Sequence, residues 1–323
     1  MSQDVSIQTL LGLPQDQFLN EYWTRQRYIA HLPPERLCGI FDAPELRSIE
    51  SLVATPNELL RVDVRTLEGA PAITMPTPAD AIKLYLAGNV VHISRVDAVG
   101  FRPWVSTLTR ELTVPPGLLK FNVFASRRGF GVIPHFDAQD NFIVHLRGEK
   151  RWRIAPNTTV PDPVTNGTVD VAGVNESLSP NYLNAAQAQA HYGVTNWPKD
   201  MPANCEVVDM KPGSVMYLPR GYWHAVETTA SESLHITIVC AIPTRVDVVR
   251  KLLAGLLPDM LERDPYWRER LTKSWSEHGP DEQVIRETLQ RLLVELPKLS
   301  DVNINREAIA RAYSKISLRP KYL

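Results

Sequence analysis

The sequence predicts an α+β protein in which a strand-rich middle is flanked by helices on both sides. Short apolar or β-branched runs, separated by turn residues, recur between residues 119 and 241, which is typical of a β-sandwich or barrel. On both sides of this region, apolar residues recur with the helical period of about 3.6 residues. The 26 prolines among 323 residues also favour many loops and turns over a long helical array.

The N-terminal region is predicted to consist of helices and one strand. Aromatic residues punctuate the first expected helix, and Pro33 and Pro34 end its pattern. Gly88 ends a later helix, and the run of valine and isoleucine that follows it indicates a strand. The expected helices are 1–30, 43–51, 78–86 and 101–112, and the expected strand is 90–94.

The middle of the chain is predicted to fold as short strands. Residues 141–146, a turn at Gly148 and residues 150–154 have the pattern of a β-hairpin. Residues 156–204, rich in Asn, Pro, Gly, Thr and Ala, interrupt the strands, and a connection this long is usually functional or disordered. The expected strands are 119–126, 141–146, 150–155, 205–210, 215–218, 225–228 and 234–241.

The C-terminal region again has a helical pattern, which begins after Pro243. The pattern is clearest over 282–296, where leucine and isoleucine recur on one face. This apolar stripe fits either the core of the chain or the interface of a homodimer. The expected helices are 246–257, 266–276, 282–296 and 305–316.

These patterns divide the chain into three regions. Residues 1–80 form a helical region that braces the centre, and residues 81–245 form the central β domain, with 156–204 as its insertion. Residues 246–323 form a helical region that is a candidate for dimerisation.

Charge and cysteine content disfavour several classes of partner. The net charge is −1 and the pI is about 6.7, so no attraction to nucleic acid or to an anionic membrane is expected. The three cysteines are odd in number and far apart, which indicates a reducing cytoplasm rather than a disulfide framework. The N-terminus lacks the pattern of a secretory signal, and no apolar run approaches the roughly 18 residues of a membrane span.

The clearest chemical signal is the pair His135 and Asp137. In an extended segment, residues i and i+2 point to the same side, so both can reach one ion. His224, 89 residues beyond His135, begins another strand-like run and could complete the set. Two imidazoles and one carboxylate hold one face of Fe(II) and leave three positions open for a chelating co-substrate and dioxygen. A His-x-Asp triplet also occurs by chance in solvated turns, so its surroundings must support the assignment.

A candidate co-substrate residue, Lys150, follows these ligands. A cation inside a cavity can pair with the distal carboxylate of a dicarboxylate bound to the metal. The alternative is a surface lysine in a hairpin, but the flanking Trp152 and Ile154 favour a packed face. His145 has the same parity as Asn141, and it either lines the pocket or lies in the core.

Several motifs resemble those of a known family. Residues 131–156 and 211–240 resemble the JmjC-type Fe(II)- and 2-oxoglutarate-dependent oxygenases, and within them the cupin-like ribosomal-oxygenase branch. Asn141 is similar to an asparagine that helps to hold 2-oxoglutarate in the asparaginyl-hydroxylase branch. The stretches that carry the main resemblance are 134–137 (PHFD), 146–153 (LRGEKRWR), 218–224 (LPRGYWH) and 233–238 (SLHITI).

The resemblance implies a double-stranded β-helix (a jelly roll of the cupin type) that uses Fe(II), 2-oxoglutarate and dioxygen. It implies that His135, Asp137 and His224 bind iron and act in catalysis. Lys150 would bind the far carboxylate of 2-oxoglutarate, and Asn141 would assist.

Members of this family often have a further threonine or tyrosine near the far carboxylate. Val132 stands three residues before the first iron ligand, so the further partner must come from elsewhere or be missing. Ser126 and Thr237 are candidates.

The resemblance implies hydroxylation of a C–H bond in a protein or peptide side chain, with release of succinate and carbon dioxide. Few residues follow Pro297, so the winged-helix domain of the ribosomal oxygenases is expected to be shortened or absent, which disfavours a ribosomal-protein substrate. One alternative is therefore an oxygenase of a small molecule or a biosynthetic peptide. Others are lysine demethylation and a non-catalytic, cupin-like dimeric binding module. The C-terminal helices resemble dimerisation helices, which favours a homodimer.

Several residues of the long insertion could contact a substrate. Tyr182, Tyr192 and Trp197 either line the substrate site or fasten the insertion to the rest of the fold. Arg220, next to the third ligand, either binds substrate or stabilises its turn.

Overall fold

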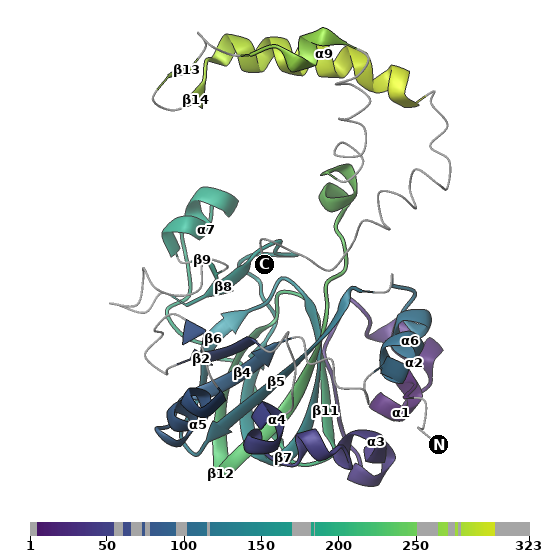
Figure 1. Cartoon of the computed structure of the whole chain (residues 1–323), viewed down its shortest axis with the longest axis vertical. Helices are drawn as coiled ribbons and strands as arrows, with labels where there is room; N and C mark the ends of the chain where they lie inside the picture. Colours follow the sequence, from purple (N-terminus) through teal and green to yellow (C-terminus); the bar gives the residue numbers. More distant parts are fainter. Residues whose placement is uncertain are drawn as a thin grey trace. The chain divides into compact units, whose positions relative to one another are not determined.

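An antiparallel sheet forms the centre of the computed structural model, and the chain divides into two units, Met1–Ile242 and Pro243–Leu323. The first unit contains the 12-stranded sheet, most of whose strands are labelled in Figure 1. It also contains all the predicted site residues. The described residues are 5–54, 61–65, 73–74, 78–94, 102–114, 117–169, 182–183, 185–250, 264–270, 275–276 and 279–300.

The sheet of the first unit contains 12 strands among the described residues. They are β1 (Tyr28–His31), β2 (Arg61–Arg65), β3 (Ile73–Thr74), β4 (Val90–Ser94), β5 (Leu119–Arg127), β6 (Gly131–Phe136), β7 (Asp140–Ala155), β8 (Asn166–Thr168), β9 (Tyr182–Leu183), β10 (Glu206–Met210), β11 (Ser214–Leu218) and β12 (Trp223–Cys240). The main path runs β1-β11-β7-β12-β5-β4-β2-β3. From this path, β10 pairs with β7 and β6 pairs with β12, while β8 joins β6 to β9.

Two long strands, β7 and β12, pair with each other along most of their length. In addition, β7 pairs with β11 and β10, and β12 pairs with β5 and β6. The predicted hairpin over 141–154 is wrong, because β7 is one strand whose two halves both pair with β12. Gly148 has a φ of +64°, and a side chain there would collide with the Glu232 carbonyl. The register of β12 shifts opposite it, between Thr228 and Ser233. Gly148 therefore marks a bulge, which bends a strand without ending it.

Helices line the N-terminal part of the first unit. They are α1 (Ile7–Leu11), α2 (Gln15–Glu21), α3 (Cys38–Phe41), α4 (Ile49–Ala54), α5 (Pro78–Leu86) and α6 (Arg102–Glu111), with 3-10 turns at Pro34–Leu37 and Pro44–Leu46. The prediction of helix up to residue 30 is wrong. Thr24 has a φ of +60° and donates its N–H to Tyr217 Oη, which ends the helical segment. The chain then enters β1 and pairs with β11.

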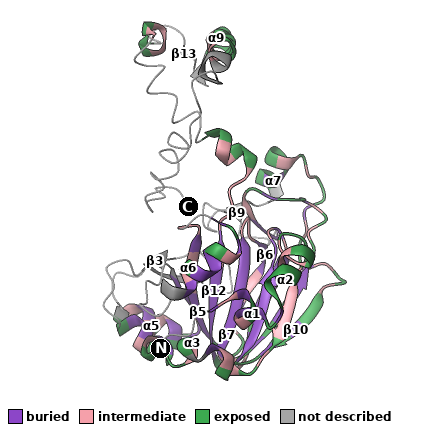
Figure 2. Ribbon diagram, turned by 90° about the vertical axis from the view of Figure 1, so that its right-hand side faces the viewer, coloured by how far each residue is buried: buried purple, intermediate pink, exposed green. Residues whose placement is uncertain are grey.

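The core lies between these helices and the sheet, where Figure 2 shows the strands as mostly buried. Phe18 of α2 packs edge-on against Tyr217 of β11, with ring centroids 5.0 Å apart, and also contacts Phe142 of β7. Burying one such ring stabilises the fold by about 2 kcal/mol. These contacts fix the first halves of β7 and β11, and thus the site that the strands carry.

The second unit contains helical segments and a two-stranded sheet. Residues 245–250 are helical, as predicted, and α9 (Glu282–Ser300) confirms the predicted helix over 282–296. The helix predicted over 266–276 is wrong, since a 3-10 turn (Pro265–Arg268) and the two-residue strand β13 (Trp275–Ser276) lie there; β13 pairs with β14 (Gly279–Pro280). Residues 251–257 and 305–316 lie outside the described residues.

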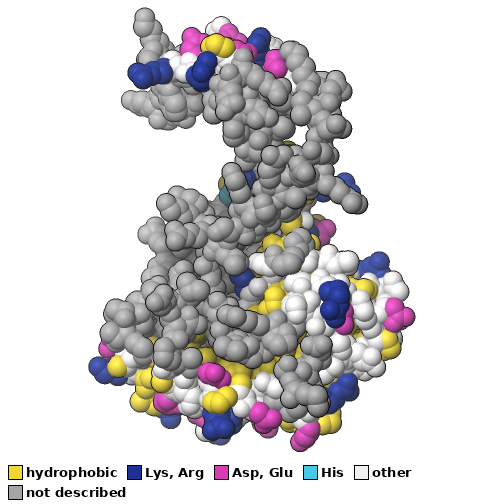
Figure 3. Space-filling view, turned by 45° about the vertical axis from the view of Figure 1, so that its right-hand side comes forward, with side chains coloured by type: hydrophobic (Ala, Val, Ile, Leu, Met, Phe, Trp, Pro, Cys, Tyr) yellow, Lys and Arg dark blue, Asp and Glu magenta, His cyan; other side chains and the backbone are white. Residues whose placement is uncertain are grey.

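Two surface properties bear on partners. On the face in Figure 3, the described Lys and Arg side chains are interspersed with Asp and Glu rather than gathered by sign. No helix in the described part of the chain has both the length and the apolar character needed to cross a bilayer.

Candidate metal and co-substrate site

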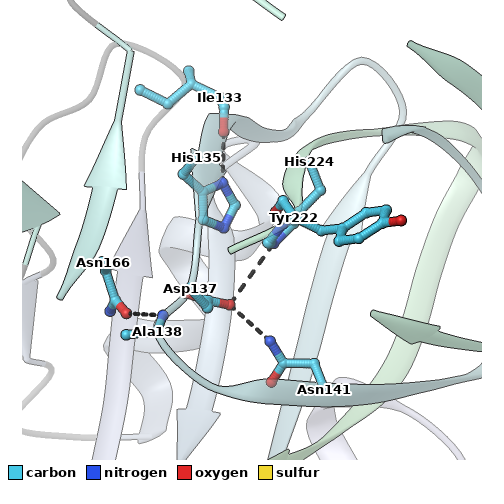
Figure 4. Close-up of polar contacts among 8 residues, drawn as sticks. All are labelled: Ile133, His135, Asp137, Ala138, Asn141, Asn166, Tyr222 and His224. Carbon is cyan, nitrogen blue, oxygen red and sulfur yellow. Dashed lines mark hydrogen bonds and ion pairs between the residues drawn. The ribbon is translucent and has the colours of Figure 1, made fainter. Parts of the chain in front are cut away.

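Two neighbouring strands bring together the three predicted metal ligands. His135 of β6 and His224 of β12 are paired across the sheet, and Asp137 follows β6 directly. The backbone N–H of Gly221 donates to the Asp137 carbonyl at 2.8 Å, which fixes the turn before His224. One donor atom from each ligand lies within 4.8 Å of the other two, and Figure 4 shows the side chains converging. The 3.8 Å between His224 Nε2 and Asp137 Oδ2 can be bridged by one ion with bonds of about 2 Å.

Backbone carbonyls determine which nitrogen of each imidazole is free for a metal. His135 Nδ1 lies 2.7 Å from the Ile133 carbonyl, and His224 Nδ1 lies 2.9 Å from the Tyr222 carbonyl. Because a carbonyl only accepts, both Nδ1 atoms carry the hydrogen and both Nε2 atoms keep a lone pair. Two neutral imidazoles and one carboxylate form a donor set that suits Fe(II). The residues therefore fit the metal that the resemblance implies.

Two asparagines hold the segment around Asp137. Asn141 is buried, and its Nδ2 donates to Asp137 Oδ2 at 3.0 Å, which orients the carboxylate (Figure 4). Asn166 of β8 accepts the backbone N–H of Ala138 at 2.7 Å. Sequence reasoning did not identify Asn166, which lies in the long insertion without a motif. The predicted contact between Asn141 and 2-oxoglutarate remains a prediction.

Lys150 lies inside the protein, where only 1% of its surface is exposed. The alternative of a surface lysine is therefore wrong. Its Nζ lies 2.9 Å from His235 Nδ1, within hydrogen-bond distance, and burial lowers the pKa of Lys150 to about 7. His235 belongs to the stretch 233–238 that carried the resemblance, but the sequence did not indicate this partner.

The other predicted polar residues near Lys150 are also buried. His145 Nε2 donates to the Gly148 carbonyl at 3.0 Å, which favours the interpretation as a core histidine. Burial lowers its pKa to about 3, and the nearby Lys150 contributes. Ser126 Oγ lies 2.7 Å from Thr228 Oγ1, on the strand segment that pairs with Lys150. The roles predicted for Ser126 and Thr237 toward 2-oxoglutarate remain predictions.

The insertion is fastened to the ligand strand. Trp197 Nε1 donates to the Thr168 carbonyl at 2.7 Å, and Thr168 pairs with His135. The indole also packs against Phe136 and Trp223, which favours a fastening role over substrate contact.

The remaining candidates for substrate contact differ in what they touch. Tyr192 accepts the backbone N–H of Val164, and Arg220 forms an ion pair with Asp162 at 3.2 Å. The side chain of Tyr182 lies outside the described residues.

The sheet and its set of two buried histidines and one partly buried carboxylate define a fold of the cupin-like class. The JmjC domain family matches residues 110–248, which include the three candidate ligands, Lys150 and His235. Residues 110–248 are therefore similar to a JmjC domain, and the α+β jelly-roll fold that the sequence predicted is confirmed.

Relatives in sequence include a bacterial and an animal protein. Uncharacterized protein YxbC of Bacillus subtilis (strain 168) is 29% identical over 284 residues, which cover 86% of this chain and 82% of YxbC. Ribosomal oxygenase 1 of Gallus gallus is 30% identical over 266 residues, which cover 79% of this chain. The match spans only 40% of Ribosomal oxygenase 1.

Solved structures show the same fold. Escherichia coli YcfD, a ribosomal oxygenase, superposes with a TM-score of 0.52 at 16% identity, over 94% of this chain and 71% of the YcfD chain. A structure of YcfD in complex with cobalt and succinic acid gives a TM-score of 0.50 at 15% identity, over 94% of this chain and 70% of that chain.

Proposed function

We propose that this protein is an Fe(II)- and 2-oxoglutarate-dependent dioxygenase that hydroxylates a C–H bond of a protein or peptide side chain and releases succinate and carbon dioxide. One observation carries the proposal: His135, Asp137 and His224 direct a complete donor set at one point. The solved YcfD complex with cobalt and succinic acid, which has this fold, supports the choice of metal and co-substrate class.

Each residue has a distinct part in this function. The two histidines would bind the metal through Nε2, because their Nδ1–H groups are engaged by backbone carbonyls. Asn141 would hold Asp137 Oδ2, the oxygen that lies 3.8 Å from His224 Nε2, and so keep the carboxylate oriented toward the metal. Bound iron would supply the activation of dioxygen, and the protein would supply position and exclusion of water. Lys150 would hold the far carboxylate of 2-oxoglutarate.

The test is Fe(II)-dependent turnover of 2-oxoglutarate by the full chain, compared with Asp137→Ala. Loss of an outer partner of a metal ligand costs roughly 10–100-fold in affinity or activity, so loss of the ligand itself should lower succinate production by about 100-fold or more. Asp209→Ala is the matched control, because Asp209 is an exposed aspartate of β10 whose side chain pairs with Arg151 of β7. Undiminished succinate production by Asp137→Ala would exclude this metal site.

The substrate class rests on the relatives that are named ribosomal oxygenases. An oxygenase of a small molecule or biosynthetic peptide uses the same site and differs in what stimulates turnover. After incubation of the enzyme with cellular protein, mass spectrometry of tryptic peptides should reveal a side chain whose mass has increased by one oxygen. Loss of a methyl group instead would indicate demethylation. A binding module without activity would take up metal and leave 2-oxoglutarate unconsumed.

We also propose a cytoplasmic homodimer in which residues 246–323 form the dimerisation region and residues 1–80 brace the β domain. On α9, Ile285, Leu289 and Leu293 are exposed at helical spacing, which supports an interface. Cys205 and Cys240 are free thiols, which fits a reducing compartment. Sedimentation of the wild-type chain and of Leu289→Glu tests the dimer, and the variant should sediment as a monomer.

A further inference from the structure

A row of aromatic side chains crosses the four neighbouring strands β7, β12, β5 and β4. In register, His145 of β7 pairs with His235 of β12, His235 with Phe124 of β5, and Phe124 with His92 of β4. The Phe124 ring stacks on His235 at 5.0 Å and on His92 at 4.3 Å between centroids. All three histidines of this row are buried.

Lys150 is attached to the row at His235. The two side chains are at most 3% exposed, and the 2.9 Å contact joins Lys150 Nζ to His235 Nδ1. Within the described part of the chain, no carboxylate pairs with this lysine. A buried ammonium without an anion is costly, whereas a neutral amine that donates to an imidazole is not.

We propose that His235 is a positioning residue of the co-substrate site: its Nδ1 accepts a hydrogen bond from the uncharged Lys150 amine, and binding of 2-oxoglutarate takes up one proton from solvent onto Nζ. The amine and the proton form the ammonium that pairs with the far carboxylate, and no other bond changes. This inference rests on the proposed function, since it takes 2-oxoglutarate as the co-substrate.

The imidazoles near Lys150 do not compete with Nζ for the proton near pH 7. Burial lowers the pKa of His235 well below its ordinary value, with Lys150, His145 and His92 contributing, and the pKa of His145 is about 3. Both imidazoles are therefore neutral near pH 7, when Lys150, with its pKa of about 7, begins to lose its proton. A carboxylate beside Nζ raises that pKa. Proton uptake on binding should thus grow as the pH rises above 7 and vanish well below it.

The first test is calorimetry on the full chain loaded with Mn(II), titrated with 2-oxoglutarate in buffers of different ionisation heat. For a free pKa of about 7, the binding of each 2-oxoglutarate should take up about 0.9 proton at pH 8 and about 0.2 proton at pH 6.5. This measurement needs no variant and no turnover. Equal heats in all buffers at pH 8 would overturn the inference, and the binding itself would leave the proposed function standing.

Variants then test the part of His235. His235→Leu removes the acceptor that holds Nζ, and we expect the Kd for 2-oxoglutarate to rise about tenfold at pH 8. His235→Asn keeps an acceptor near the position of Nδ1 and should restore the Kd to within about threefold of wild type. His92→Phe is the matched control, because His92 stacks on the opposite face of Phe124 and the replacement keeps a ring there. It should leave both the Kd and the proton uptake unchanged.

The outcomes separate the two proposals. Wild-type affinity in His235→Leu would overturn the positioning role while 2-oxoglutarate binding persists. No binding of 2-oxoglutarate by the Mn(II)-loaded wild-type chain would refute the proposed function, and this inference with it. If His235→Leu does not fold, the wild-type buffer series and His235→Asn still decide the question.

Discussion

The metal end and the lysine end of the site share β12, but they are built by opposite means. At the metal end, His135 and His224 are each 7% exposed, and their orientation comes from the backbone carbonyls two residues earlier in the chain. At the lysine end, Lys150 and His235 are almost fully enclosed, and each is the other's polar contact.

Under the proposed function, this difference shows how one fold would form a binding site for a cation and another for an anion. Local hydrogen bonds suffice to direct neutral donors at a metal, because the ion supplies the charge. An anion site of this kind instead depends on desolvation, which leaves a basic group without an anionic partner until the ligand arrives. The two ends should therefore respond differently to substitution and to pH.

The sharpest way to separate the ends is Lys150→Met, which keeps the length of the side chain and removes the amine. The Kd for 2-oxoglutarate should rise about 100-fold or more, since losing one partner of a buried charged pair costs about 2–5 kcal/mol. The affinity for Mn(II) alone should not change. Isothermal titration of each ligand measures both values, with the exposed Lys211→Met as control. A parallel loss of metal affinity would show that the ends are not separate.

The converse change is Asn141→Ala, which removes the donor to Asp137 Oδ2. We expect Mn(II) affinity to fall roughly tenfold, as is usual when a ligand loses its outer hydrogen bond. At saturating Mn(II), the affinity for 2-oxoglutarate decides whether Asn141 also assists the co-substrate. An unchanged value would contradict the assistance predicted from the resemblance, and a weakened value would support it.

A further difference concerns stability and pH. Lys150 has a pKa of about 7 in the folded chain and an ordinary value of 10.5, so between these values the unfolded chain binds the extra proton. The free energy of unfolding of the wild type should therefore rise relative to Lys150→Met from pH 7 to 9, by at most about 1.4 kcal/mol per pH unit. Urea unfolding of both proteins without metal measures the slope. A difference that stays constant with pH would mean that the amine remains protonated inside the fold.

Much of the site could be predicted because its signals are local. The i, i+2 spacing of His135 and Asp137 predicted two side chains on one side of an extended segment, and the structure has them there. Lys150 could be inferred from the apolar residues around it. Its partner His235 could not, because 85 residues separate them and only the folded sheet brings them together.

The errors in the fold have the same origin. Gly148 was interpreted as a turn, since a turn and a bulge both place glycine at positive φ, and only the partner strand distinguishes them. Tyr28 continues an aromatic spacing that suits a helix, yet pairing with β11 makes residues 28–31 a strand. In both cases a distant strand decides what the local pattern leaves open.

The continuity of β7 and β12 has a consequence for selectivity. Asn141 and His224 are each the second residue of their strand, and Lys150 and His235 lie further along the same two strands. The distance between the metal ligands and the Lys150 amine is thus set by strand pairing rather than by loops. Under the proposed function, a keto diacid one methylene shorter than 2-oxoglutarate would reach only one end of the site, so the length of the acid would determine which one binds.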